Sequence, residues 1–194
     1  MRKNKKKGFT LVELLAVIVI LAILLAIAVP AVTKYITKSR KDGMIATAQE
    51  FADAIRNDAT SEFYDFPIAN NDITIVSIDL IKLEKGKKKS SFNGRWLPRY
   101  SYVAVINTGT EDDPDYEYFI AVRDSKRYTI TLSKAEDITR ESIIRSSSTN
   151  TTTNITSMCG SEDGEYMVID KIVGLEKYQP VGGWNATVYS SEGC

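Results

Sequence analysis

Residues 1–30 read MRKNKKKGFTLVELLAVIVILAILLAIAVP, and the apolar run inside this stretch decides the fold of the N-terminal part. From Phe9 to Val29, only Thr10 and Glu13 interrupt a sequence of Leu, Val, Ile, Ala and Phe. A helix over this run would be about 31 Å long, which matches a hydrocarbon core of about 30 Å. Apolar residues on every face favour lipid or a dense helical bundle over one-sided packing. We therefore expect a membrane-spanning helix over residues 9–30.

A basic leader, residues 1–8, precedes this helix. Its five cations are Arg2, Lys3, Lys5, Lys6 and Lys7. Under the positive-inside rule the leader stays in the cytoplasm, and everything after Pro30 is delivered to the outer face of the membrane. Without the leader, 20 of the 25 basic residues remain against 25 acidic ones. The rest of the chain is mildly acidic and gives no general reason to bind nucleic acid.

The composition argues against an enzyme. The chain has no His, which excludes His-based acid–base or nucleophilic catalysis and His metal ligands. Its two cysteines are far apart and offer neither a CxxC redox pair nor a four-ligand zinc site. We expect no catalytic residues, no metal and no cofactor.

Two ordinary interpretations of the apolar segment leave Glu13 unexplained. In a plain membrane anchor, a carboxylate deep in the helix costs about 2.5–3.5 kcal/mol, although the cost falls toward the interface. In a secretory signal peptide, Ala26-Ile27-Ala28 would be the cleavage site. Glu13 and the unusual length of the apolar run argue against a signal peptide.

The stretch KKGFTLVELLAVIVILAILLAIAVP resembles the N-terminal signature of type IV prepilins and pseudopilins. The shared features are a short basic leader, a Gly, an aromatic residue, Thr-Leu-Val-Glu-Leu, a long apolar helix and a proline at Pro30. The resemblance implies that a prepilin peptidase cuts between Gly8 and Phe9 and that Phe9 is then N-methylated. It also implies a pilin fold and no enzymatic activity.

The resemblance gives Glu13 a physical role. Cleavage would create an α-amino group on Phe9, four residues from Glu13 and on the same helical face. The carboxylate could meet this amine in its own chain or in a neighbouring subunit, and a buried charge is tolerable only with a partner. We therefore expect Glu13 to set the axial register of assembly.

Two residues predict a bend in the long helix. Pro30 removes a backbone donor, which costs about 3 kcal/mol in a helix interior, and Gly43 is a second weak point. We expect a bent or locally melted helix there. The alternative is that Pro30 simply ends the membrane helix.

An amphipathic helix is expected to continue over residues 31–62. Its apolar stripe consists of Met44, Ala48, Phe51, Ala52, Ile55 and Ala59. We thus expect one helix from about Phe9 to about Thr60. Its first half would be the membrane anchor, and its second half would pack on a domain. Residues 63–194 form the predicted globular extracellular domain.

Strand patterns dominate this domain. The stretches RYSYVAVIN, YEYFIAV, RYTITLS, EYMVIDKIV and NATVYS are rich in β-branched and aromatic residues, and turn-prone segments separate them. A strand over Ile73–Val76 and a short helix over Ile78–Glu84, capped by Ser77, are both allowed. The predicted fold is α+β, a long N-terminal helix packed on an antiparallel sheet.

The C-terminal region contains a polar loop and both cysteines. In residues 146–157, SSSTNTTTNITS, almost every position is Ser, Thr or Asn, which predicts an exposed loop. N-x-S/T matches fall at Asn150, Asn154 and Asn185; they are open to glycosylation or are simply solvated. Cys159 and Cys194 lie on the oxidising side, where a disulfide would stabilise the fold by roughly 3–4 kcal/mol. The resemblance implies that residues 159–194 are the disulfide-bounded region of a pilin.

A basic patch with interleaved aromatics is a candidate surface for DNA or a host surface. Its residues are Lys82, Lys85, Lys87, Lys88, Lys89, Arg95, Trp96 and Arg99. The simpler interpretation is a solvated loop, or one that pairs with acidic residues of the next subunit.

The sequence thus predicts a structural subunit of a type IV pilus, and it favours the major pilin over a minor one. We expect the subunit in the cytoplasmic membrane before assembly and in an extracellular filament afterwards. The implied partners are other copies of the chain, the prepilin peptidase, the membrane assembly platform with its ATPase motor, and minor pilins. The alternatives are a minor pilin or a pseudopilin of a secretion or DNA-uptake machine, and a monomeric membrane-anchored binding domain.

Overall fold

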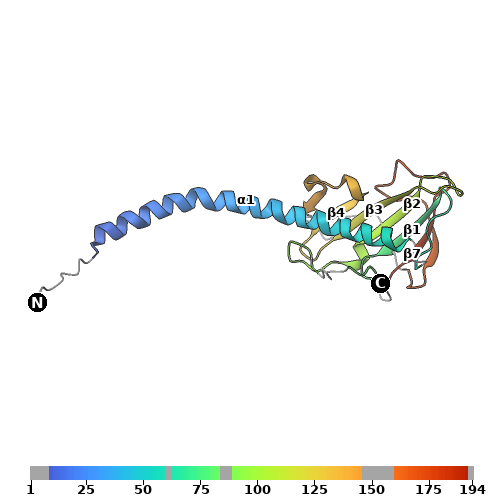
Figure 1. Cartoon of the computed structure of the whole chain (residues 1–194), viewed down its shortest axis with the longest axis horizontal. Helices are drawn as coiled ribbons and strands as arrows, with labels where there is room; N and C mark the ends of the chain where they lie inside the picture. The colour runs from blue at the N-terminus through green and yellow to red at the C-terminus, as the bar shows by residue number, and fades with distance from the viewer. Residues whose placement is uncertain (1–8, 60–62, 84–88, 146–159, 192–194) are drawn as a thin grey trace, which may run out of the picture. The chain divides into compact units, whose positions relative to one another are not determined.

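The computed structural model describes residues 9–59, 63–83, 89–145 and 160–191. The chain divides into two compact units, Met1–Ser39 and Arg40–Cys194. The elements are one helix, α1 (Leu11–Asp58), and seven strands, β1 (Asp72–Ser77), β2 (Tyr102–Asn107), β3 (Tyr116–Arg123), β4 (Tyr128–Lys134), β5 (Ile143–Arg145), β6 (Glu165–Ile169) and β7 (Trp184–Tyr189) (Figure 1). Three short 3-10 helices lie at Pro98–Tyr100, Ala135–Asp137 and Arg140–Ser142.

Helix α1 confirms the predicted long helix to within two residues at each end. It continues through Pro30 and through Gly43, so the alternative in which Pro30 ends the helix is wrong. A bend at either residue stays a prediction.

The seven strands form one sheet in the order β5-β4-β3-β2-β1-β7-β6. All neighbours are antiparallel except β1 and β7, which are parallel, with Ile73 beside Ala186 and Ile75 beside Val188. The predicted antiparallel sheet is therefore confirmed except at this pair, which is parallel. Parallel neighbours need a long connection, and here strands β2 to β6 lie between the two in the chain.

The sequence alternatives around residue 77 are also resolved. Asp72–Ser77 is a strand, and residues 78–80 form a turn where a short helix capped by Ser77 was allowed. Strand β5 was not predicted, because three residues are too few to show a period.

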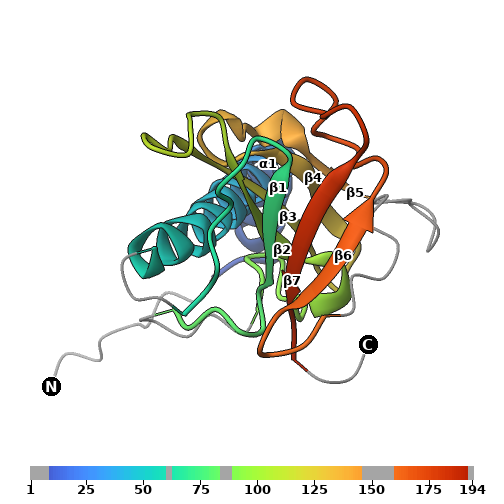
Figure 2. The same cartoon turned by 90° about the vertical axis from the view of Figure 1, so that its right-hand side faces the viewer.

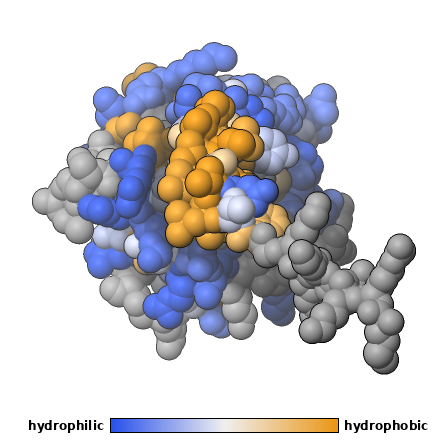
Figure 3. Space-filling model, turned by 90° about the vertical axis from the view of Figure 1, so that its left-hand side faces the viewer, coloured by the Kyte–Doolittle hydropathy of each residue, from blue (hydrophilic) through white to orange (hydrophobic). Residues whose placement is uncertain are grey.

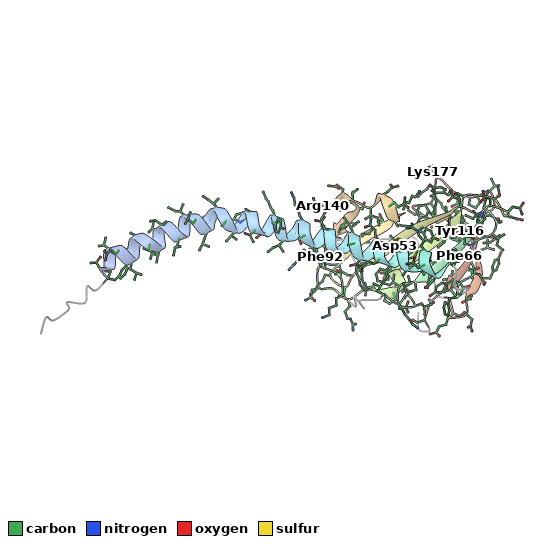
Figure 4. The ribbon with its side chains drawn as sticks, in the orientation of Figure 1. Asp53, Phe66, Phe92, Tyr116, Arg140 and Lys177 are labelled. Carbon is green, nitrogen blue, oxygen red and sulfur yellow. The ribbon has the colours of Figure 1, made fainter. Side chains whose placement is uncertain are left out.

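The first half of the core lies between the second part of α1 and one face of the sheet (Figure 2). Most of the predicted stripe is buried there: Met44, Ala48, Phe51, Ala52 and Ile55 are at most 3% exposed, whereas Ala59 lies beyond the helix and is only partly buried. At the far end of this layer Phe66 packs edge-on against Tyr116, with ring centroids 5.2 Å apart (Figure 4). The α+β fold with one helix on a sheet is confirmed.

The other face of the sheet is covered by the segment 170–183. Ile172 and Leu175 from this segment are at most 1% exposed and join Trp184 in a second apolar cluster. Gln179 holds the segment together, because its side-chain oxygen accepts the indole N–H of Trp184 at 3.2 Å and its amide donates to the carbonyl of Asp170 at 2.9 Å. The central strands of the sheet are therefore buried on both faces.

Candidate processing and assembly site

The start of α1 is built around Thr10 and Glu13. The carboxylate of Glu13 accepts the backbone N–H of Thr10 at 2.9 Å and its hydroxyl at 2.8 Å, and the N–H of Glu13 donates to the Thr10 hydroxyl at 3.3 Å. The carbonyl of Thr10 accepts the first helical bond, from Leu14 at 3.2 Å. This reciprocal pattern is a capping box, in which the two side chains satisfy backbone donors that a helix start leaves free.

This cap is a role of Glu13 that the sequence analysis missed, although the T-x-x-E spacing just before an apolar run is its usual signal. Phe9, the residue predicted to be methylated, precedes the helix and is 86% exposed. Gly8, on the other side of the predicted cut, lies outside the described residues. The predicted cleavage point therefore adjoins an exposed residue that is not part of the helix.

The first part of α1 presents a continuous apolar surface, coloured orange in Figure 3. Its large apolar side chains from Phe9 to Ile36 are between 44% and 86% exposed. Within the part of the chain that the structure describes, α1 is the one helix long and apolar enough to cross a membrane. Such a surface needs lipid or other helices to cover it.

Polar side chains begin at Thr33, three residues after Pro30. The hydroxyl of Thr33 donates to the carbonyl of Val29 at 2.9 Å, and the hydroxyl of Thr37 donates to that of Thr33 at 3.0 Å. A shallow groove here is lined by Val29, Pro30, Thr33, Lys34, Thr37 and Lys38. The change from apolar to polar and basic residues fits an interface between hydrocarbon and water at this point.

Gly43 has a packing role in the globular unit. A Cβ atom at Gly43 would lie 3.1 Å from the Cβ of Ser91, and the Ser91 hydroxyl bonds to the carbonyl of Arg40. The small residue therefore lets the hairpin around residue 91 approach the helix backbone. This contact explains the glycine without a bend.

The predicted basic patch is divided in the structure. Lys82 lines a pocket of about 400 Å³ together with acidic side chains of α1, among them Glu50 and Asp53. Lys89 and Arg95 are bridged neighbours on a small hairpin. Arg99 is exposed, and Lys85, Lys87 and Lys88 lie outside the described residues.

The one Trp of that patch is turned into the core. The ring of Trp96 packs edge-on against Phe51 of α1, with centroids 6.1 Å apart. Base stacking needs an open aromatic face, so this geometry does not support Trp96 as a stacking platform.

The two cysteines lie outside the described residues, but the segments that lead to them meet. The N–H of Gly160, which follows Cys159, donates to the hydroxyl of Ser190 at 2.8 Å. Ser161 is bridged to Tyr189. The disulfide stays a prediction.

Comparison with known proteins places the N-terminal segment. Residues 3–29 match the family model described as the prokaryotic N-terminal methylation motif. It is 50% identical over 54 residues to the type IV major alpha-pilin of Moraxella bovis and, equally, to the fimbrial protein Q of the same organism.

Each match covers 26% of this chain and 34% of the relative, so the chain spans about a third of the length of the relatives it matches. No solved structure matches the chain. The resemblance to type IV pilins is thus confirmed over the N-terminal part.

Proposed function

We propose that the chain is the precursor of a structural subunit, the major pilin, of a type IV pilus. The observation that carries the proposal is the methylation motif over residues 3–29, together with a helix whose apolar surface is exposed among the described residues. In this proposal the prepilin peptidase cuts after Gly8, Phe9 is N-methylated, and the subunits polymerise through their helices. The major role is supported by the similarity to one relative, a type IV major alpha-pilin.

The cost of exposing the apolar helix to water favours two environments in turn, first lipid and then a bundle of neighbouring helices. Burying a large apolar side chain is worth about 1.5–3 kcal/mol, so exposing this surface to water would cost tens of kcal/mol in total. Lipid covers it before assembly, and neighbouring helices cover it in a fibre. Because lipid and helices are nearly equally apolar, little spontaneous drive leads from one to the other. Extraction therefore needs the motor and platform named above.

The globular unit contributes a surface rather than a catalytic centre. Among the described residues, no group of three or more Cys, Asp or Glu side chains is placed to hold a metal ion. The central strands of the sheet are buried on both faces, and α1 supplies one of the two layers. The unit is suited to lie on the outside of a fibre whose centre is made of helices.

The intact mass of the protein from its native host tests this proposal. We expect loss of residues 1–8 and the addition of one methyl group at Phe9. As the matched control, Gly8→Val should stop cleavage while leaving the cations and the apolar run unchanged. An uncleaved wild-type chain would refute the proposal. Imaging after deletion of the gene then distinguishes a major subunit, whose loss removes abundant filaments, from a minor one.

A further inference from the structure

The shallow groove at the end of the apolar run combines apolar residues with two cations. Val29 and Pro30 line one end of this groove. Lys34 and Lys38 line it about one and two turns beyond Pro30. Its volume is about 610 Å³. The groove is thus apolar where the apolar run ends and positively charged beyond that point.

The charges of the two lysines are not balanced by neighbouring acids. Both side chains are exposed, and no ion pair between described residues includes either of them. The chain has no Asp or Glu between Glu13 and Asp42. At a spacing of four residues the two ammonium groups share one helical face, where like charges repel each other. An anion between them would remove this repulsion.

The ammonium groups are the side-chain donors that the groove leaves free. The hydroxyl of Thr33 already donates to the carbonyl of Val29 at 2.9 Å, and the hydroxyl of Thr37 donates to the carbonyl of Thr33 at 3.0 Å. A hydroxyl has one proton to donate. An anion in the groove must therefore be held by Lys34 and Lys38, which bind a phosphate as point charges.

The position of the lysines along α1 matches the level of lipid headgroups. If the apolar run to Val29 fills the hydrocarbon core, Lys34 lies about 7.5 Å beyond it and Lys38 about 6 Å further. The headgroup layer is about 5–7.5 Å thick on each side of the core. Helical side chains tilt toward the N-terminus of the helix, which brings both ammonium groups back toward this layer. Tyr35, which is 74% exposed, belongs to the residue types that are enriched at the same level.

We propose that this groove binds the headgroup phosphate of an anionic phospholipid in the outer leaflet of the membrane. Lys34 and Lys38 hold the phosphate, and the apolar end of the groove lies against the start of an acyl chain. Such a lipid holds the subunit at a fixed depth, and extraction into a fibre must break this contact. The inference rests on the membrane stage of the proposed function and uses neither cleavage nor polymerisation.

Photo-labelling of the full chain in vesicles tests the site. The vesicles contain phosphatidylcholine and a small fraction of phosphatidylglycerol that carries a photoreactive group at the start of one acyl chain. Mass spectrometry locates the labelled residues. We expect labelling within residues 29–38, and roughly 25-fold less from a phosphatidylcholine probe with the same group, since each cation near an anionic surface contributes about fivefold. Labelling near the leader, at the other end of the span, is the internal standard, because no variant changes it.

Substitutions in the groove separate its charge from its shape. Lys34→Gln and Lys38→Gln should each lower the labelling about fivefold, and the two together about 25-fold, to the level of the phosphatidylcholine probe. Thr33→Val combined with Thr37→Val is the matched control, because it alters the same groove without changing its charge. This control should be labelled as strongly as the wild type, and so should the chain with both lysines replaced by Arg.

Equal labelling by the two probes, or no loss in the double Gln variant, would overturn the proposal. An equal loss in the Thr control would also overturn it, because the shape of the groove would then decide the binding. Inorganic phosphate, compared with chloride at equal ionic strength, should not compete; competition would make the groove a site for free phosphate. Labelling that disappears when the protein density in the vesicles is raised would assign the groove to a second copy and refute the lipid.

The assay and the intact-mass test fail independently. Photo-labelling needs neither cleavage nor filaments, so its failure leaves the proposed function standing. An uncleaved chain in the intact-mass test would leave the lipid site standing and remove only its part in extraction.

Discussion

The substitution Glu13→Gln separates two roles of this side chain, the helix cap and the negative charge. In the structure the Glu13 carboxylate accepts two hydrogen bonds from Thr10, at 2.9 and 2.8 Å. Gln keeps an acceptor oxygen at the same place and is itself a capping-box residue. It removes the charge that pairing with the amine of Phe9 requires.

The two roles differ in size. Losing a cap costs about 0.5–2 kcal/mol, whereas leaving one partner of a buried ion pair alone costs about 3–5 kcal/mol. At about 1.4 kcal/mol for each factor of ten, Glu13→Gln should lower assembly by roughly two to three orders of magnitude if charge pairing sets the register. Thr10→Val, which removes the hydroxyl but keeps the charge, should lower it by about 25-fold at most.

Filament yield measures this difference. Pilin in sheared filaments and in the membrane fraction would be quantified for wild type, Thr10→Val, Glu13→Gln and Glu13→Val. Intact mass would establish that each variant is cleaved and methylated. We expect Glu13→Gln to resemble Glu13→Val, with normal insertion and few filaments. Wild-type filament yield from Glu13→Gln would refute the charge-pairing argument and leave the cap as the function of this residue.

Three further predictions concern the globular unit, and thermal unfolding of the full chain in detergent measures each. Gly43→Ala should change the stability little, because the gain in helix propensity offsets the close contact with Ser91. Gly43→Leu should lower the free energy of unfolding by about 1–3 kcal/mol. Equal effects of these two substitutions would contradict the packing role of Gly43. Asp124 is fully buried and accepts the hydroxyl of Ser90 and two backbone N–H groups at 2.9 Å, so Asp124→Ala should cost about 3 kcal/mol or more and Asp124→Asn clearly less. Burial opposes ionisation of Glu117, but hydrogen bonds from Tyr178 and Lys134 outweigh this effect and lower the pKa of Glu117. The ionised carboxylate therefore stabilises the fold by about 1 kcal/mol above the ordinary carboxyl range, and this stabilisation is lost as the pH falls through the lowered pKa. Glu117→Gln should abolish this loss.

The helix and most strands could be predicted because their signals are local. The stripe from Met44 to Ile55 repeats at helical spacing, and the β-branched runs are long enough to show a strand. The parallel pairing of β1 with β7 has no such signal, since it depends on which edge of the sheet a distant strand reaches. Its two partners, Ile73 and Ala186, are more than a hundred residues apart.

The basic patch shows why proximity in sequence is a poor guide to a surface. Arg95 and Trp96 are neighbours in the chain, but Arg95 is exposed while the ring of Trp96 packs on Phe51. Lys82, thirteen residues before Arg95, lines a pocket with acidic side chains of α1. The burial of an aromatic side chain depends on the tertiary fold, which a count of cations cannot reveal.

The cap at Thr10 also sets how strong the contact between Glu13 and a neighbouring amine must be for assembly. Because the N–H and hydroxyl of Thr10 already satisfy the carboxylate of Glu13, a single chain carries its acid at low cost before any partner arrives. Cleavage before Phe9 leaves this cap intact, since the N–H of Thr10 belongs to the peptide bond that follows Phe9. A neighbouring amine must therefore offer more than these two bonds provide, and a charge-assisted bond in an apolar bundle does so. We therefore expect the cap to make the acid tolerable in the anchor, and the proposed fibre to use its charge.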